Sequence, residues 1–207
     1  MIWAQSISGV IARSGTIPWR LPEDQERFKE LTLNRTVVMG RLTWESLPDS
    51  VRPLPQRENI VLTRNPDYRV PGARVVSNMS QVPLDDAWVI GGAHVYAAAL
   101  PLAQRCEVTE VDVDLNPQDG DVLAPELGNK WSVTTGDWRV SSTGLRYRYL
   151  TYTRRPRRFA LPPVFDRMND IPYRWAGSKD TPGDCSGLGL ANATESSERR
   201  KRDTIRR

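Results

Sequence analysis

A carboxylate on the apolar side of a predicted helix is the residue in this sequence best suited to chemistry. Pro22 fits the first turn of a helix, and residues four and seven apart share a helical face, so Asp24 stacks over Phe28 and Leu31. A carboxylate on such a face is costly unless it is paired, and no Lys or Arg lies close enough on that face. Asp24 therefore either binds a ligand or caps the first-turn amides. The other charged residues of this helix are predicted to face water: Glu23, Glu26, Arg27 and Glu30.

Two predicted strand-to-helix junctions carry glycine where a phosphate could bind. Gly40 ends one β-branched run, and Thr43 or a neighbour is predicted to cap the short helix that follows. Gly91 and Gly92 end a second run and precede an alanine-rich helix. Free amides at helix N-termini attract anions, so two such junctions indicate a dinucleotide. The spacing is not G-x-G-x-x-G, and a standard Rossmann domain is not predicted.

The order of the elements predicts how these residues are positioned. Strands alternate with helices through residue 100 and dominate after it, which indicates an α/β layered sheet with an antiparallel C-terminal edge. Residues 106–114 alternate between apolar and charged side chains around Thr109 and predict a strand with one wet face. Residues 8–15 are rich in Gly and Ser and predict a long loop leading to Asp24.

Composition separates a body from a tail. The 207 residues carry a net charge of +4, but residues 154–207 hold 13 of the 29 Lys and Arg residues and only 7 of the 25 Asp and Glu residues. The tail is thus about +6 and the body about −2, so basicity says little about the body. Residues 154–207 lack any apolar period and are predicted to be a mostly disordered basic tail.

The same composition argues against several classes of protein. No apolar run approaches the roughly 18 residues of a membrane span, and the start lacks a signal peptide, which predicts a cytoplasmic protein with no membrane partner. The two cysteines are far apart, and the only histidine, His94, is expected to be an exposed first-turn residue. Neither a disulfide nor a metal site is expected.

Six stretches taken together and in order resemble bacterial dihydrofolate reductase, most closely its actinobacterial form. They lie within residues 1–153, and they are specific as a set although each is weak alone: Trp3-Ala4, residues 17–24, residues 38–46, residues 52–57, Ile90-Gly91-Gly92 with Tyr96, and Thr109. The resemblance implies a three-layer α/β fold whose mixed, mostly parallel eight-stranded sheet is flanked by helices. It also implies a catalytic domain at 1–153 that reduces 7,8-dihydrofolate to 5,6,7,8-tetrahydrofolate with NADPH for one-carbon and thymidylate metabolism.

The resemblance also assigns roles to residues. Catalysis is carried over to Asp24, Trp19 and Thr109. The residues implied to bind dihydrofolate are Ile2, Asp24, Phe28, Lys29, Leu54, Arg57, Ile90, Tyr96 and Thr109. The residues implied to bind NADPH are Ala4, Ile11, Gly15, Ile17, Gly40, Arg41, Leu42, Thr43, Leu62, Thr63, Arg64, Ile90, Gly91, Gly92, Ala93, Val95 and Tyr96. The Gly91–Gly92 bond is expected to be cis, residues 10–21 to form a mobile loop, and Gly120-Asp121 to support its closed form.

The sequence departs from the family pattern at three positions, and two alternative functions also fit parts of it. Ala12 and Ala93 replace usual glycines, and Leu42 stands where a polar or basic residue often meets the 2′-phosphate, which weakens the expected preference for NADPH over NADH. One rival is an NADPH reductase of a riboflavin-pathway pyrimidine. The other is a nucleotide- or RNA-binding regulator that uses the basic tail. Residues 17–24, Leu54 and Arg57 favour folate over the pyrimidine, and the presence of Asp24 and Thr109 argues against the regulator. We also expect a monomer with no specific nucleic-acid partner.

Overall fold

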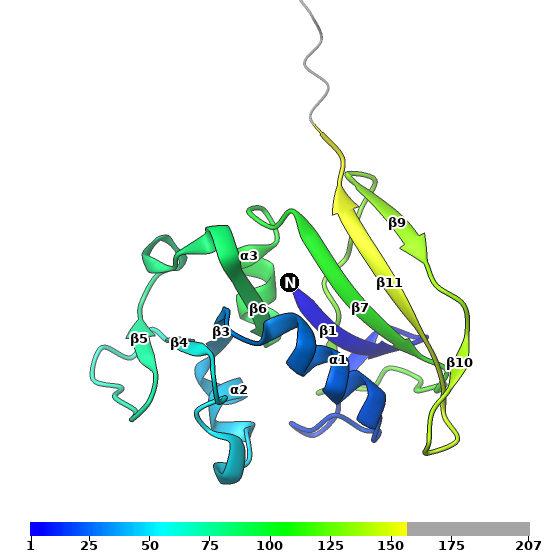
Figure 1. The fold of residues 1–207 in the computed structure, drawn as a ribbon, viewed down its shortest axis with the longest axis horizontal. Helices are drawn as coiled ribbons and strands as arrows, with labels where there is room; N and C mark the ends of the chain where they lie inside the picture. The colour runs from blue at the N-terminus through cyan, green and yellow to red at the C-terminus, as the bar shows by residue number, and fades with distance from the viewer. Residues whose placement is uncertain (157–207) are drawn as a thin grey trace, which may run out of the picture. The chain divides into compact units, whose positions relative to one another are not determined.

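The computed structural model describes residues 1–156 of the chain (Figure 1). Within the described residues, the helices lie among strands up to residue 99 and only strands follow them, as predicted. The helices are α1 (Pro22–Thr32), α2 (Arg41–Ser46) and α3 (Ala93–Ala99), with 3-10 turns at Asp49–Val51, Met79–Gln81 and Leu84–Asp86. The strands are β1 (Ile2–Ser6), β2 (Val10–Ala12), β3 (Thr36–Gly40), β4 (Glu58–Leu62), β5 (Arg74–Val76), β6 (Ala87–Gly91), β7 (Arg105–Val111), β8 (Val122–Leu123), β9 (Trp131–Thr135), β10 (Arg139–Val140) and β11 (Arg146–Arg154). None of the helices in this part of the chain is long and apolar enough to cross a membrane.

The strand pairing confirms the predicted sheet and its antiparallel edge. Strands β5, β4, β3 and β6 are parallel neighbours in that order, while β1 is parallel to β7. Strand β11 runs antiparallel to β7, and both β9 and β10 pair with β11. Strands β6 and β1 lie side by side, and the Tyr96 hydroxyl of α3 donates a 2.7 Å hydrogen bond to the Ile2 carbonyl beside them. Eight strands therefore follow one another from β5 to β9, with the ladder interrupted between β6 and β1.

Helix α1 begins at Pro22, as predicted, but two of the charged side chains that were expected to face water are bound by other elements instead. The carboxylate of Glu23 accepts hydrogen bonds of 2.6 and 2.8 Å from the turn at residues 141–142, which lowers the pKa of Glu23 to about 2. Arg27 forms an ion pair with Glu107, whose side chain is fully buried. A helical wheel assumes one buried face, whereas α1 is covered both by β7 and by the turn between β10 and β11.

Glu107 also corrects the prediction of a strand with one wet face. Strand β7 is buried on both sides: Cys106 and Val108 are inaccessible on one face, and Glu107 and Thr109 are buried on the other. Alternating charge indicated solvent, but here the charged side chain pairs beneath α1 instead.

Two local predictions near the glycine junction and the N-terminal loop are also wrong. Helix α2 begins at Arg41 with Gly40 as its N-cap and without a side-chain cap, so Thr43 lies inside the helix. Glycine is among the residues favoured at the N-cap, although it has no side chain with which to accept a hydrogen bond from the first-turn amides. The loop over 8–15 is interrupted by β2, which pairs antiparallel with β8.

The core fixes the position of α1 and of the glycine junctions. Val37 and Val38 are both inaccessible although they point to opposite faces of β3, as expected for a parallel strand covered on both sides. One core cluster, which the half-buried Phe28 and Ile90 join, is made of Val37, Met39, Trp44, Leu54 and Val61. Strand β3 therefore links the first turns of α1 to the sheet edge where α2 and α3 begin.

The ordered contacts of β11 continue one residue past the predicted boundary at Thr153. The Arg154 amide donates 2.9 Å to the Gln104 carbonyl, its Nε donates 2.6 Å to the Ala103 carbonyl, and its guanidinium stacks 4.6 Å from the Trp131 ring. The rest of the predicted basic tail, residues 157–207, lies outside the described residues.

Truncation tests where the folded body ends. A chain that ends at Pro156 should keep the melting temperature of the full chain, because every contact above is retained. A chain that ends at Thr153 should melt roughly 3–8 °C lower, since it loses hydrogen bonds worth about 1–3 kcal/mol. Thermal denaturation followed by circular dichroism compares the two, and equal melting temperatures would show that Arg154 does not anchor β11.

Candidate active site

Asp24 and Thr109 meet between α1 and β7. The Thr109 hydroxyl donates a 2.5 Å hydrogen bond to Oδ1 of Asp24, and Thr109 is itself 1% exposed. Burial raises the pKa of the Asp24 carboxyl, while the Thr109 bond and the charge of Arg27 oppose that rise. The sequence placed this carboxylate on the buried face correctly, and the structure supplies a neutral partner for one of its oxygens.

Apolar residues predicted to bind the substrate gather beside this carboxylate. Phe28, one turn beyond Asp24 in α1, packs in the same cluster as Leu54 and Ile90. Ile2 is buried in β1, the strand next to β7. Phe28, Leu54 and Ile90 form an apolar wall, and Phe28 connects it to Asp24 because the two residues are one helical turn apart.

Arg57 lies at one end of this wall, but Lys29 does not join it. The guanidinium of Arg57 lies 5.9 Å from the centre of the Phe28 ring and donates a 3.1 Å hydrogen bond to the Thr32 hydroxyl. Partial burial lowers its pKa, and it has no acidic partner within residues 1–156. Lys29 is exposed on α1. Arg57 is therefore held in place with its charge available.

The two glycine junctions meet at the C-terminal ends of β3 and β6. Gly40 and Gly92 are the N-caps of α2 and α3, and the Gly91–Gly92 bond is cis, as predicted. A Cβ on Gly40 would lie 3.1 Å from Cγ2 of Val95, and one on Gly92 would lie 3.4 Å from Oγ1 of Thr43. The backbones thus approach closely and present their amides together, which fits a phosphate group.

Other residues predicted to bind the cofactor line the path away from this junction. Ala4 pairs with Thr109 in the β1–β7 ladder, and Ile11 is buried in β2. Ile17 and Leu42 are 60% and 70% exposed. Leu62 is the last residue of β4, and Thr63 and Arg64 follow it. Ala93 and Tyr96 lie in α3, and Gly15 lies in the N-terminal loop.

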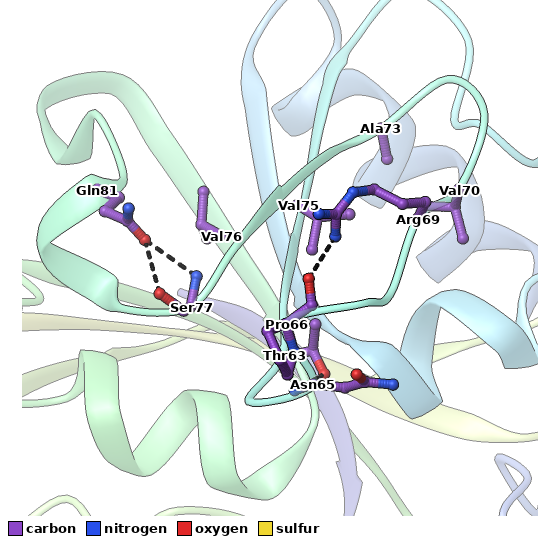
Figure 2. A pocket seen from close by; sticks show the side chains of 10 residues that line it. All are labelled: Thr63, Asn65, Pro66, Arg69, Val70, Ala73, Val75, Val76, Ser77 and Gln81. Atoms are coloured by element: carbon purple, nitrogen blue, oxygen red, sulfur yellow. Dashed lines mark hydrogen bonds between the residues drawn. The ribbon is translucent and has the colours of Figure 1, made fainter.

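The predicted site for a 2′-phosphate is only partly assembled. Arg41 forms a 3.0 Å ion pair with Glu45 on its own helix, while Arg64 is exposed beyond the end of β4. A cavity of about 500 Å³ opens next to Thr63 (Figure 2). Apart from Thr63, the residues that line the cavity were not predicted to bind the cofactor: Asn65, Pro66, Arg69, Val70, Ala73, Val75, Val76, Ser77 and Gln81.

One local sequence pattern could have indicated the structure beside this cavity, and it involves Gln81. Its side-chain oxygen accepts 3.0 and 3.2 Å hydrogen bonds from the amide and hydroxyl of Ser77 (Figure 2). The same oxygen accepts from the Asn78 amide and so closes a capping box between Asn78 and Gln81, a pattern readable from these two residues three apart. These hydrogen bonds hold Gln81 in place on this side of the cavity.

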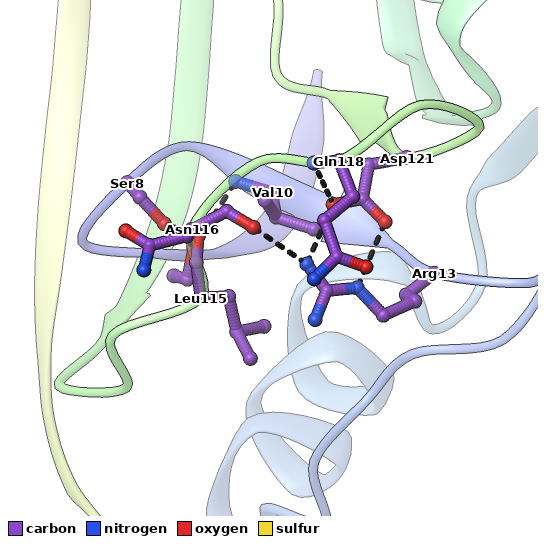
Figure 3. Close-up of polar contacts among 8 residues, drawn as sticks. Ser8, Val10, Arg13, Leu115, Asn116, Gln118 and Asp121 are labelled. Carbon is purple, nitrogen blue, oxygen red and sulfur yellow. Dashed lines mark hydrogen bonds and ion pairs between the residues drawn. The ribbon is translucent and has the colours of Figure 1, made fainter.

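The predicted mobile loop is fastened to the predicted supporting loop by a charged side chain (Figure 3). Arg13 donates from Nε and Nη2 to the carboxylate of Asp121, at 2.9 and 2.7 Å, and also 2.9 Å to the carbonyl of Asn116. The Arg13 bond, aided by the Gln118 amide, lowers the pKa of Asp121 to about 2. Near the end of the predicted loop, Trp19 packs against a cluster of Leu21, Val111 and Tyr147.

The α/β sheet, the carboxylate one helical turn from an apolar wall, and the two glycine junctions together indicate an oxidoreductase that binds a nucleotide cofactor. Residues 1–154 match the dihydrofolate reductase family model. The chain is 56% identical over 155 residues to dihydrofolate reductase of Mycobacterium tuberculosis, covering 74% of this chain and 96% of that protein, and 55% identical over 161 residues to that of Mycobacterium leprae, with the same coverage. The chain belongs to the dihydrofolate reductase family.

A solved structure agrees with this assignment. Dihydrofolate reductase from Enterococcus faecalis, complexed with NADP(H) and RAB-propyl, superposes with a TM-score of 0.64 at 34% sequence identity. The alignment covers 75% of this chain and 95% of that one. The predicted fold is therefore confirmed, and the family match favours folate over the riboflavin-pathway rival.

The Arg13–Asp121 contact gives a testable account of loop order. Asp121→Asn should increase amide hydrogen exchange over residues 10–16 at neutral pH, because the bidentate pair is lost. The matched control is Asp119→Asn, which removes an exposed carboxylate from the same loop and should change nothing. Because the pKa of Asp121 is depressed, the wild-type contact is complete above the ordinary carboxyl pKa and is lost only as pH falls through about 2. Equal exchange in both variants would show that the pair does not order the loop.

Proposed function

We propose that residues 1–156 carry out the reaction of the family and that Asp24 is the group that makes it possible. The chain reduces 7,8-dihydrofolate to 5,6,7,8-tetrahydrofolate and uses NADPH as its cofactor. The observation that carries the residue assignment is the Asp24–Thr109 hydrogen bond beside the apolar wall of Phe28, Leu54 and Ile90. A pterin ring is flat and apolar on its faces and carries its hydrogen-bonding groups on its edge, so it matches this wall and this carboxylate.

Asp24 would act on the substrate through charge. Its ionised carboxylate accepts hydrogen bonds from the amidine edge of the pterin and stabilises the protonated imine nitrogen. The Thr109 hydroxyl holds the other side of the carboxylate and so fixes its direction. A charge fixed in a dry, apolar site is worth far more in the transition state than one in water, because little solvent reorganises as positive charge develops.

The reaction adds a hydride to the imine carbon and a proton to the adjacent nitrogen. The dinucleotide supplies the hydride when it is bound. Gly40, Thr43 and the Gly91–Gly92 junction would hold its phosphates through backbone amides, and Ala4 and Ile11 would border the nicotinamide end. The close approach of the two glycine backbones is the feature that fits this cofactor.

Arg57 would recognise the part of dihydrofolate that distinguishes it from a simple pteridine. A guanidinium fork matches the α-carboxylate of the glutamate, and Arg57 is already fixed by Thr32 and the carbonyl of Pro55 at 3.0 Å. Lys29 is exposed on the same helix as Phe28 and would add only long-range attraction.

We further propose a cytoplasmic monomer with an appended tail. The matching bacterial reductases support this setting. The folded catalytic domain would end near Arg154, where the family model also ends, and residues beyond it would contribute charge rather than catalysis.

Asp24→Asn should lower dihydrofolate reduction at pH 7 by about 10²-fold or more, the range typical for loss of a positioned acid–base group. The amide cannot carry the charge that stabilises the protonated pterin, so activity should recover partly at low pH, where free dihydrofolate is protonated more often. Steady-state rates across pH measure this. The matched control is Glu26→Gln, on the exposed side of the same helix, which should keep the wild-type pH profile. If Asp24→Asn were nearly as active as wild type at pH 8, Asp24 would not have the catalytic role proposed here.

Arg57→Ala should weaken binding of dihydrofolate about 10- to 100-fold, which corresponds to the roughly 1.5–3 kcal/mol of a hydrogen bond to a charged group. NADPH affinity should stay unchanged, and a pteridine without glutamate should lose little. Fluorescence titration of each ligand makes the comparison. Equal weakening of all three ligands would mean that the substitution acted through the fold.

The preference for NADPH over NADH should rest on Arg64 more than on Arg41, because Arg41 is already paired with Glu45. Arg64→Gln should reduce the kcat/KM ratio of the two cofactors roughly tenfold, as expected for a lost charge-assisted contact. Arg35→Gln, which removes a surface partner of Asp86, is the control. An unchanged ratio in Arg64→Gln would place the 2′-phosphate elsewhere.

A further inference from the structure

A second polar pair lies beside Asp24 and Thr109, and the reaction described above does not use it. Glu107 is fully buried in β7, two residues before Thr109, so both side chains point to the same face of the strand. Its carboxylate accepts hydrogen bonds from the guanidinium of Arg27, from Nε of Arg105 and, at 2.9 Å, from the Thr151 hydroxyl. Glu107 is therefore saturated with donors from α1, β7 and β11.

Arg27 belongs to the helix that carries Asp24 and lies three residues further along it. Its side chain is only 16% exposed, and its guanidinium lies 4.2 Å from the centre of the Tyr149 ring. Nη1 is buried without a hydrogen-bond partner among the described residues. Glu107 thus neutralises Arg27 through one nitrogen, while aromatic stacking fixes the plane of the group.

The two polar pairs form successive rungs between α1 and β7. Three residues of helix rise about 4.5 Å, and two residues of strand about 6.6 Å, so Asp24–Thr109 and Arg27–Glu107 can both form across one helix–strand contact. A buried ion pair adds little net stability compared with apolar packing, so its stability alone does not explain Arg27–Glu107. Its distinctive consequence is a fixed positive charge one helical turn from Asp24.

We propose that Arg27, held by Glu107, is a positioning residue for Asp24: it sets the first turns of α1 on β7 and supplies the charge that keeps the buried Asp24 carboxylate ionised. The proposal deepens the proposed function and rests on the role given there to Asp24. The charge of Arg27 is already one of the causes that oppose the upward shift of the Asp24 pKa.

Arg27 is the one charged group among the causes that shift the pKa of Asp24, and it acts in addition to burial and the Thr109 hydrogen bond. Asp24 faces Thr109 of β7, Tyr149 of β11 and the buried hydroxyl of Tyr96 of α3, and none of these brings a positive charge. The remaining cations lie around Glu107 or Tyr149: Arg105, which is 60% exposed, Arg139 at 5.2 Å from the Tyr149 ring, and the Met1 amino group. Solvent screens the exposed ones, so Arg27 dominates at Asp24.

Two charge-removing variants should therefore move the Asp24 titration in opposite directions. Arg27→Gln should raise its midpoint by roughly 0.5–1 unit, because a nearby positive charge is gone. Glu107→Gln should lower the midpoint, because the charge of Arg27 is no longer neutralised. Arg27→Lys keeps the charge and should leave the midpoint within about 0.3 unit of wild type even if the protein melts lower.

The readout is a carbon-13 NMR titration of the Asp24 carboxyl in the free protein, identified by its absence in Asp24→Asn. The matched control is Arg148→Gln, which removes the ion pair between Arg148 of β11 and Glu110 of β7. This variant should not shift the titration midpoint of Asp24. The acid limb of kcat/KM for dihydrofolate should follow each midpoint. If Glu107→Gln does not fold, the Asp24 midpoints of Arg27→Gln and Arg27→Lys are compared with each other, and this comparison tests the proposal.

Midpoints that rise with Arg27→Gln and stay with Arg27→Lys would support the proposal. An unchanged midpoint in Arg27→Gln, or shifts of the same sign in Arg27→Gln and Glu107→Gln, would overturn it and leave the pair a purely structural tie. The titration needs no turnover, so it separates this proposal from the function. Opposite shifts together with a fully active Asp24→Asn would support the electrostatic coupling and remove Asp24 from catalysis.

Discussion

Keeping a carboxylate ionised on an apolar face is the constraint on which this site depends. Asp24 is removed from water by α1 and β7, and burial alone would favour its neutral form. Thr109 offsets the larger part of that cost by donating a hydrogen bond to the charged form, and the positive charge of Arg27 offsets a smaller part. Both partners depend on how α1 lies on β7, so the helix–strand contact sets the chemistry as much as the carboxylate does.

The sheet supplies the rest of the site by bringing distant segments to one edge. Parallel strands β3 and β6 end at the same place, and both continue directly into helices through glycine. A Cβ on Gly40 would lie 3.1 Å from Val95 and would displace that side chain, whereas a Cβ on Gly92 would make an ordinary contact with Thr43 at 3.4 Å. The Tyr96 hydroxyl then ties α3 to β1 where the ladder is interrupted, and so connects the cofactor edge to the strand beside β7.

Local sequence patterns predicted the parts of this arrangement that a single segment determines. Pro22 marks the start of α1, and paired glycines after a buried run mark the junction at α3, because these signals act within a few residues. The pairing of Arg27 with Glu107 was not predictable in this way. Arg27 and Glu107 are 80 residues apart in the sequence. Hydrophobic periodicity is evaluated within one helix or strand, and there it predicts that both charged side chains face solvent. The NADPH and folate roles came from the combined motifs, since no single spacing specifies them.

The most direct test of the account is the rate of hydride transfer when Thr109 can no longer orient Asp24. Thr109→Val keeps the shape of the side chain but cannot donate, whereas Thr109→Ser keeps the hydroxyl. Loss of NADPH absorbance in a single turnover with dihydrofolate should slow about tenfold or more in Thr109→Val, as expected when a buried charged group loses a hydrogen bond, and should stay near the wild-type rate in Thr109→Ser. A Thr109→Val protein that transfers hydride as fast as wild type would contradict the claim that the Asp24–Thr109 pair controls the reaction.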